Sequence, residues 1–67
     1  MSDDREDLND ETTLTMSVPA AGALVGLNRN AAYAAADRGE IPTVRFGRLR
    51  RVPKKALRQK LQEAGLL

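Results

Sequence analysis

The chain has 67 residues, which is enough for one small domain with a modest core. It contains neither cysteine nor histidine, which excludes disulfides, zinc fingers and imidazole-based catalysis, and none of its apolar runs approaches the roughly 20 residues of a membrane span. The acidic N-terminus has the wrong sign for a signal peptide. We therefore expect a cytoplasmic protein that is not an enzyme, with no metal, no cofactor, and neither a membrane nor a small-molecule partner.

The net charge of +2 hides a strong asymmetry along the chain. Residues 1–11 hold six acids and one base, a net charge of −5, whereas residues 12–67 hold ten bases and three acids, a net charge of +7. Because residues 1–11 lack apolar periodicity, we expect a disordered acidic tail there and a folded domain over residues 12–67. A domain this basic suits a polyanionic partner, nucleic acid first and an anionic membrane second.

The first predicted elements are a short extended segment and a helix. Residues 12–16 are strand-like, with Leu14 and Met16 able to point inward. Ser17 is a suitable N-cap for a helix over residues 18–25, whose first turn tolerates a proline. The expected inward stripe of this helix, spaced i, i+3, i+4, is Ala21, Leu24 and Val25.

A second helix is predicted over residues 29–38, capped by Asn28 and ended by Gly39. The apolar Leu27 follows Gly26 in the connection, where it can fill the angle between the two helices. Two short helices joined by a Gly-x-Asn turn are typical of a helix-turn-helix motif. An ordinary αα-hairpin has the same pattern, and these residues alone do not separate the two.

The remaining third of the chain favours the first alternative. Residues 43–46 and 49–52 are β-prone runs separated by Gly47-Arg48, which predicts a hairpin, and a third helix follows over residues 53–64. The side chains expected to face the core are Val44, Phe46, Val52, Leu57, Leu61 and Ala64. This order predicts an α+β, mostly helical fold: a winged helix-turn-helix with three short helices and a two-stranded β-hairpin wing.

The second helix is the expected recognition helix. Its predicted DNA contacts are Asn28, Arg29, Asn30 and Tyr33. The first turn of such a helix enters the major groove, where arginine pairs with guanine and asparagine with adenine edges. Asn28 has the alternative role of N-cap, and Tyr33 either donates its hydroxyl to a phosphate or packs on the wing. Because alanines fill the middle of this helix, we expect sparse base readout, with DNA shape or several bound protomers supplying the remaining specificity.

The predicted hairpin is the strongest electrostatic signal. Its expected DNA contacts are Arg45, Arg48, Arg50 and Arg51. The glycine turn is narrow enough for a minor groove, so Arg48 at the tip is the expected groove contact. A solvated charged hairpin is the alternative. Further cations are predicted to clamp phosphates without reading sequence, namely Arg38, Lys54, Lys55 and Arg58.

Residues 13–62 resemble the small excisionases, or recombination directionality factors, of temperate phages and integrated elements. The stretch from Gly39 to Pro53 is the most specific part. The resemblance is carried by Leu14-Thr15, Ser17-Val-Pro-Ala-Ala21, Leu24-Val-Gly-Leu-Asn-Arg-Asn30, Tyr33, Arg38-Gly-Glu-Ile-Pro42, Val44-Arg-Phe-Gly-Arg48 and Arg51-Val-Pro53. The fold of that family is similar to the MerR-type winged helix, and the alanine-rich composition looks like that of a phage of an actinobacterial host, in the style of mycobacteriophages.

The resemblance implies a function for this chain. Several copies bind adjacent repeats in an attachment region and bend it, so that a phage integrase assembles an excision-competent complex on double-stranded DNA. Three positions depart from the family pattern. Ala20 stands where a glutamate often completes a capping box, and Ala34 stands where a basic residue is frequent. Gly22 replaces a usual alanine, which costs about 1 kcal/mol of helix stability unless close packing compensates.

Two other function classes remain open at this point. A small transcriptional regulator on the same fold would bind a promoter, because a fold does not fix a function. An antitoxin-like protein-interaction module would use the acidic tail to dock on a basic partner. The tail also admits the hypothesis that it competes with DNA for the wing, although a solubilising role explains its charge equally well.

Overall fold

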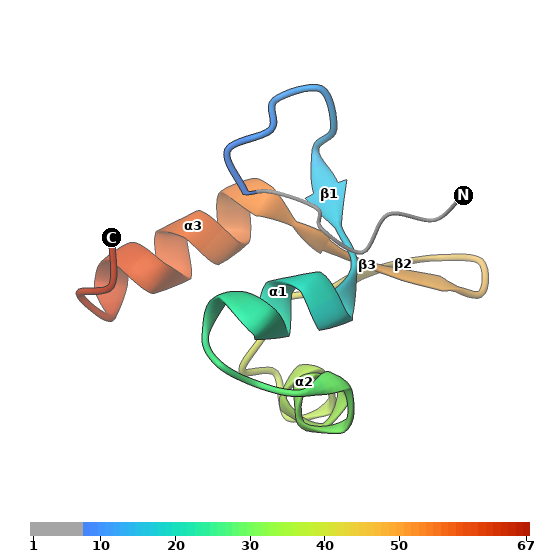
Figure 1. Ribbon diagram of the computed structural model, residues 1–67. Helices are drawn as coiled ribbons and strands as arrows, with labels where there is room; N and C mark the ends of the chain where they lie inside the picture. Colours follow the sequence, from blue (N-terminus) through green and yellow to red (C-terminus); the bar gives the residue numbers. More distant parts are fainter. Residues whose placement is uncertain (1–7) are drawn as a thin grey trace.

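The computed structural model describes residues 8–67; residues 1–7, the greater part of the predicted acidic tail, lie outside the described residues. Three short helices surround one end of a small antiparallel sheet, and the other end of the sheet projects as a wing (Figure 1). The elements are β1 (Thr15–Met16), α1 (Val18–Leu24), α2 (Arg29–Asp37), β2 (Val44–Phe46), β3 (Leu49–Pro53) and α3 (Lys54–Glu63). The predicted winged helix-turn-helix is confirmed; the bounds of the helices and of the two hairpin strands differ from those expected by at most one residue, whereas β1 begins three residues later than expected.

The sheet has the strand order β1-β3-β2. The extended segment before α1 thus joins the wing as a third strand, pairing Met16 with Val52. At the other edge Phe46 pairs with Leu49, so the connection between β2 and β3 is the two-residue turn Gly47-Arg48. Gly47 has a positive φ of 62° and Arg48 does not, as in a type II′ turn, which matches the twist of the flanking strands.

This register decides which side chains of the wing can reach the core. Side chains alternate between the two faces of a strand, so Val52 and Arg50 share the inner face, and Phe46 lies on the outer face with Leu49. Val52 is fully buried, as expected, whereas Phe46 is 62% exposed and Val44 is also exposed. The expectation that Val44 and Phe46 face the core was therefore wrong, because only the inner face of the sheet is covered by helices.

Helix α1 lies across α2 at the helix-turn-helix angle, and both N-caps are formed as expected. Ser17 Oγ accepts from the amide of Ala20 at 3.2 Å, and Asn28 Oδ1 accepts from the amide of Ala31 at 2.8 Å. Gly22 is buried where the two helices meet, and a Cβ atom placed there would collide with Ala32. Close packing therefore explains the glycine at this position.

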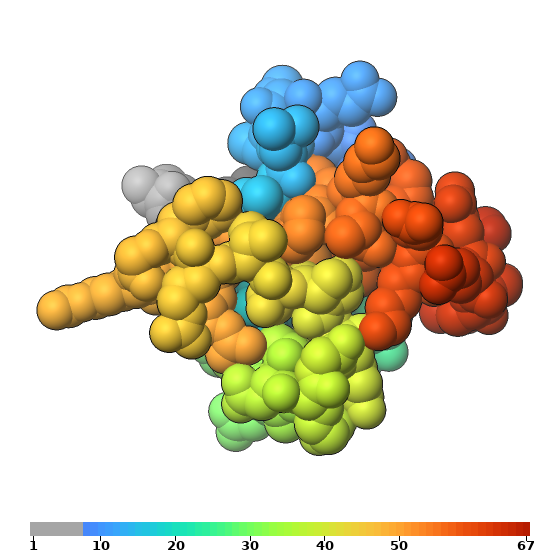
Figure 2. All heavy atoms as spheres, turned by 180° about the vertical axis from the view of Figure 1, so that it is seen from behind, coloured from blue at the N-terminus to red at the C-terminus, as the bar shows by residue number. Residues whose placement is uncertain are grey.

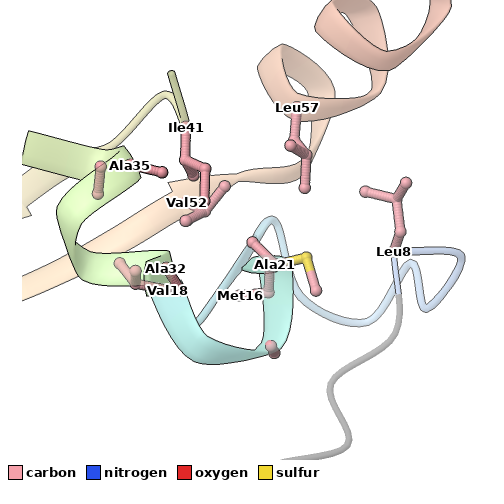
Figure 3. Close-up of a cluster of buried hydrophobic side chains, with 11 residues drawn as sticks. Leu8, Met16, Val18, Ala21, Ala32, Ala35, Ile41, Val52 and Leu57 are labelled. Atoms are coloured by element: carbon pink, nitrogen blue, oxygen red, sulfur yellow. The ribbon is translucent and has the colours of Figure 1, made fainter. Parts of the chain in front are cut away.

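The core is built largely from small side chains. Val52 and Ile41 meet Ala32 and Ala35 of α2 on one side, and Met16, Ala21 and Leu57 extend the cluster toward α3 (Figure 3). Of the other inward predictions, Leu61 packs partly against the core and Ala64 is exposed. Leu24 and Val25 are also exposed, since α1 ends at Leu24 and its last turn lies beyond the part that α2 and β3 cover.

Leu8 occupies a core position beside Met16 and Leu57 (Figure 3). Its side chain is 7% exposed, and its carbonyl accepts from Arg58 Nη2 at 3.0 Å. Leu14, the residue expected to point inward from this part of the chain, is 84% exposed. The expectation of a disordered tail through residue 11 is thus corrected for residues 8–11, because an apolar anchor and hydrogen bonds to α3 hold this segment on the domain.

Candidate nucleic-acid interface

The outer face of α2 presents the side chains predicted for the recognition helix. Arg29 and Asn30 in the first turn are exposed, and within residues 8–67 neither forms a hydrogen bond or an ion pair. Tyr33, one turn later, is 37% exposed. Asn28 caps the helix through its side-chain oxygen. No acidic side chain lies in the first turn, so the positive end of the helix dipole is uncompensated and favours an anion.

The middle of α2 offers little for base reading. Ala32, Ala35 and Ala36 are buried against the core. Ala34 is exposed and Ala31 is half-buried on the outer side. A methyl group can contact a thymine methyl and cannot donate or accept, so sequence readout by α2 is confined to its first turn and Tyr33.

The wing projects beyond the body of the molecule beside α2 (Figure 2). Arg48 lies in the turn at its tip, and Arg45 lies on the inner face, opposite Arg50. Arg45 and Arg48 are exposed and, within the described part of the chain, have no hydrogen-bond or ion-pair partner. These two arginines are therefore available to an external anion.

The other two wing arginines are engaged inside the protein. Arg50 Nη1 lies 3.0 Å from Asp37 Oδ1, an ion pair that joins the wing to the end of α2. Arg51 lies on the outer face, where Nε donates to Thr15 Oγ1 at 3.1 Å and Nη2 to the Thr15 carbonyl at 3.2 Å. Arg51 thus ties β3 to β1, and the two arginines differ from Arg45 and Arg48 in already having partners.

The cations predicted as phosphate clamps are not equivalent. Lys54 is only 5% exposed, and its ammonium donates to the Asp10 carbonyl at 2.5 Å and to Thr13 Oγ1 at 2.6 Å. The assignment of Lys54 to DNA phosphate is corrected here, because its ammonium is buried and its hydrogen bonds hold residues 10–13 on the domain. Arg58 is likewise half-buried against the Leu8 carbonyl. Lys55 is exposed and lines a groove with Leu14, Val44 and Phe46, on the outer side of the sheet away from α2.

Arg38 follows α2 and forms an exposed pair with Glu40. Its Nη2 lies 3.0 Å from Glu40 Oε1, and its Nε lies 3.1 Å from Oε2, so the contact is bidentate. The hydrogen bond from Arg38, reinforced by its charge, lowers the pKa of Glu40, and the same contact raises the pKa of Arg38. Both acids near the recognition helix, Asp37 and Glu40, are therefore paired, which limits their repulsion of a polyanion.

The predicted contacts fall into two groups: some are exposed and have no partner within residues 8–67, and the others are engaged inside the protein or lie elsewhere. The wing meets α2 at the last turn of the helix, where Arg50 pairs with Asp37. The exposed and unpartnered side chains of the first two turns of α2 and of the inner face and tip of the wing are Arg29, Asn30, Tyr33, Arg45 and Arg48. We call these five residues the basic face.

Sequence reasoning passed over the acidic partners that define this face. Asp37 and Glu40 were not predicted as ion-pair partners, although Asp37 is the last residue of α2 and Glu40 follows it by three positions. The short Arg-Gly-Glu spacing was a usable signal for the Arg38–Glu40 pair. The Asp37–Arg50 pair has no such local signal, because thirteen positions separate the partners.

Within residues 8–67, no helix has the length and apolar character that crossing a bilayer requires. No solved structure was found to match this chain significantly.

The comparisons with known proteins agree with this geometry. A protein of Saccharopolyspora erythraea described as "Probable excisionase" is 45% identical over 42 residues, which are 63% of this chain and 43% of that protein. The chain thus spans less than half the length of this curated relative. Residues 15–65, from β1 to the end of α3, match the family described as "Helix-turn-helix domain". The chain belongs to this helix-turn-helix domain family.

Proposed function

We propose that this chain is a small excisionase-type protein that binds double-stranded DNA through the basic face. The observation that carries the proposal is the pairing pattern of the charges. The exposed arginines of α2 and of the wing tip are unpartnered within residues 8–67, while the two acids beside them are each held by an arginine. A surface with free guanidinium groups and neutralised carboxylates favours a polyanion.

In this proposal, α2 and the wing enter two adjacent grooves. The first turn of α2 enters the major groove, where Arg29 and Asn30 reach base edges and Tyr33 reaches a phosphate. The wing then lies over the adjacent minor groove, with Arg48 inserted and Arg45 against the backbone. Because α2 offers few polar side chains, backbone contact and DNA shape carry most of the affinity in this arrangement.

In the proposed excisionase role, DNA binding by this chain controls the direction of recombination. Several copies occupy adjacent repeats of an attachment region in the host cytoplasm, bend the DNA, and so direct a phage integrase toward excision. Support comes from the excisionase-like order of motifs in residues 13–62 and from the name of the Saccharopolyspora erythraea relative. The chain itself performs no catalysis in this role.

A footprint of the purified protein on two DNA fragments tests the proposal. One fragment carries the attachment region of the genetic element that encodes the chain, and the other carries the promoter upstream of its own gene. We expect protection of adjacent repeats in the attachment region, and loss of that protection in Arg48→Ala.

The other outcomes separate the alternatives. Protection confined to the promoter contradicts the excisionase role and leaves a transcriptional regulator on the same fold. Absence of protection on both fragments at low salt contradicts DNA binding altogether. Protection that is equal in the wild type and in Arg48→Ala contradicts the assignment of the wing tip to the minor groove.

A further inference from the structure

One ion pair connects the two parts of the basic face. Asp37 ends α2, and Arg50 lies on the inner face of the wing with its Nη1 atom 3.0 Å from Asp37 Oδ1. The Arg50 side chain is 24% exposed and that of Asp37 is 69% exposed. Thirteen positions separate the partners, so the contact restrains tertiary structure rather than a local turn.

The wing is joined to α2 at two places. At its base, Val52 of β3 meets Ala32 and Ala35 of α2 in the core (Figure 3). Helix α2 packs mainly on α1, and the strands of the wing pack mainly on each other and on β1, α1 and α3. The wing extends beyond the helices, with its outer face uncovered (Figure 2). Arg50 lies between Val52 and the wing tip, so its ion pair with the last residue of α2 acts on the part of the wing that extends past this core contact.

The charges on the inner face strengthen this argument. Arg45 and Arg50 are directly opposite each other on paired strands, an arrangement in which like charges destabilise the pairing. The carboxylate of Asp37 neutralises Arg50 and thereby relieves this repulsion. Arg45, which has no partner within residues 8–67, keeps its charge for an external anion.

We propose that Asp37 is a positioning residue for DNA recognition: it holds Arg50, and through Arg50 the wing, at one fixed orientation to α2. When α2 and the wing are held at one angle, they fit only duplexes whose major and minor grooves have the matching spacing and width. The carboxylate of Asp37 therefore raises the specificity of binding, while its negative charge lowers the affinity for DNA of any sequence. This inference rests on the proposed DNA binding. It predicts that Arg50 fixes the orientation of the wing and does not contact a phosphate.

The test compares Asp37→Asn with a matched control, Glu40→Gln. Both variants remove one exposed carboxylate that an arginine holds near the end of α2, and only the first removes the link to the wing. Binding is measured by fluorescence anisotropy on a duplex selected from a random library with the wild-type protein, and on a scrambled duplex of the same length and composition. The quantity compared is the specificity ratio, which is the affinity for the selected duplex divided by the affinity for the scrambled duplex.

We expect Asp37→Asn to bind the scrambled duplex more tightly, to steepen the salt dependence by about one phosphate contact as Arg50 is released, and to lower the specificity ratio by about fivefold. Glu40→Gln should raise both affinities alike and leave the ratio unchanged. An unchanged ratio in Asp37→Asn, or an equal change in the two variants, would overturn the inference.

A charge exchange and a measurement without DNA complete the test. Arg50→Asp alone should lower the ratio, and Asp37→Arg combined with Arg50→Asp should recover most of it; a double variant no better than the single one contradicts a direct link. Residual dipolar couplings of the free protein should show a wider spread of wing orientations in Asp37→Asn than in the wild type. The spread in Glu40→Gln should equal that of the wild type. If the wild type binds neither duplex, the proposed function fails, and the couplings still decide whether Asp37 positions the wing.

Discussion

Two adjacent lysines at the start of α3 illustrate how much a single position determines. Lys54 is buried with its ammonium on the Asp10 carbonyl and Thr13 Oγ1, whereas Lys55 is exposed. Composition and spacing give both residues the same prediction, a phosphate clamp. The structure separates them because the helix turns by about 100° per residue, which directs one side chain to the N-terminal segment and the next to solvent.

We therefore expect Lys54→Ala to lower the free energy of unfolding by about 1–2 kcal/mol, because charge-assisted hydrogen bonds and the packed aliphatic stem are lost together. Lys55→Ala should change it by less than about 0.5 kcal/mol. Urea unfolding followed by circular dichroism measures both. Equal effects of the two substitutions would contradict the buried position of Lys54.

Gly22 is a second position where one atom decides the outcome. Alanine at this site gains about 1 kcal/mol of helix propensity, but its Cβ would lie 3.3 Å from Ala32 Cα and in collision with Ala32 Cβ. We expect Gly22→Ala to destabilise the domain by about 1–2 kcal/mol net, because overpacking a helix contact costs more than the propensity returns. Thermal unfolding checks the sign.

The control removes the atom that Gly22→Ala would strike. In an Ala32→Gly background the added methyl group finds space, so Gly22→Ala should become neutral or stabilising there. A loss of stability that is the same in both backgrounds would locate the penalty elsewhere than in the contact between α1 and α2.

At the scale of elements, the N-terminal segment is the largest difference from the sequence prediction. Leu8 is the last apolar residue of an otherwise acidic stretch, and it packs beside Met16 and Leu57. We expect Leu8→Ala to lower stability by about 2 kcal/mol, as for other truncations of buried leucine, and the exposed Leu14→Ala to have almost no effect. The comparison is made by urea unfolding of the two variants. A smaller loss for Leu8 than for Leu14 would contradict the packing of residues 8–11.

The elements themselves could be predicted from the sequence because their signals are local. Ser17 and Asn28 cap their helices as expected, and Gly26, Gly39 and Gly65 follow them with positive φ. The Gly47-Arg48 turn was also predictable, since a two-residue hairpin connection needs glycine or a similar residue at its first position. Capping and turn chemistry depend on residues within a few positions of each other.

It was harder to predict from the sequence which faces pack on the core and which charged side chains pair with each other. The register of a two-residue hairpin already places Phe46 opposite Leu49 and away from Val52, so the exposure of Phe46 followed from an available rule. The partners of Arg50, Arg51 and Lys54 did not, because they are 13, 36, and 41 to 44 positions away. Together with Arg58, which donates to the Leu8 carbonyl 50 positions away, four of the nine cations predicted to contact DNA therefore have partners within the protein that no local pattern encodes.

At the scale of the whole molecule, the sequence shows a strongly basic domain, and the structure shows that much of this charge is already used. Of the basic side chains beside α2 and on the wing, Arg29, Arg45 and Arg48 are unpartnered within residues 8–67, and Lys55 lies on the other side of the sheet. Net charge alone therefore overstates the number of phosphates that this domain can neutralise.

The salt dependence of binding measures that number. With three phosphates neutralised, log affinity should fall against log salt concentration with a slope of about −2.7, and a contribution from Lys55 would bring the slope to about −3.6. The five or six phosphate contacts expected from the sequence would give a slope of about −5. A slope that steep would mean that the internal pairs open on DNA.

The most direct test of the central claim is the salt dependence of binding to a duplex, measured by fluorescence anisotropy for the wild type, Arg48→Ala and Arg58→Ala. If the basic face binds DNA, the wild-type slope is about −3, and the slope of Arg48→Ala is less steep by about 0.9, to about −2. Arg58→Ala should keep the wild-type slope, because the Arg58 guanidinium is held by the Leu8 carbonyl in the wild type. No binding at low salt, or a slope that Arg58→Ala reduces and Arg48→Ala does not, would contradict the assignment of DNA binding to α2 and the wing.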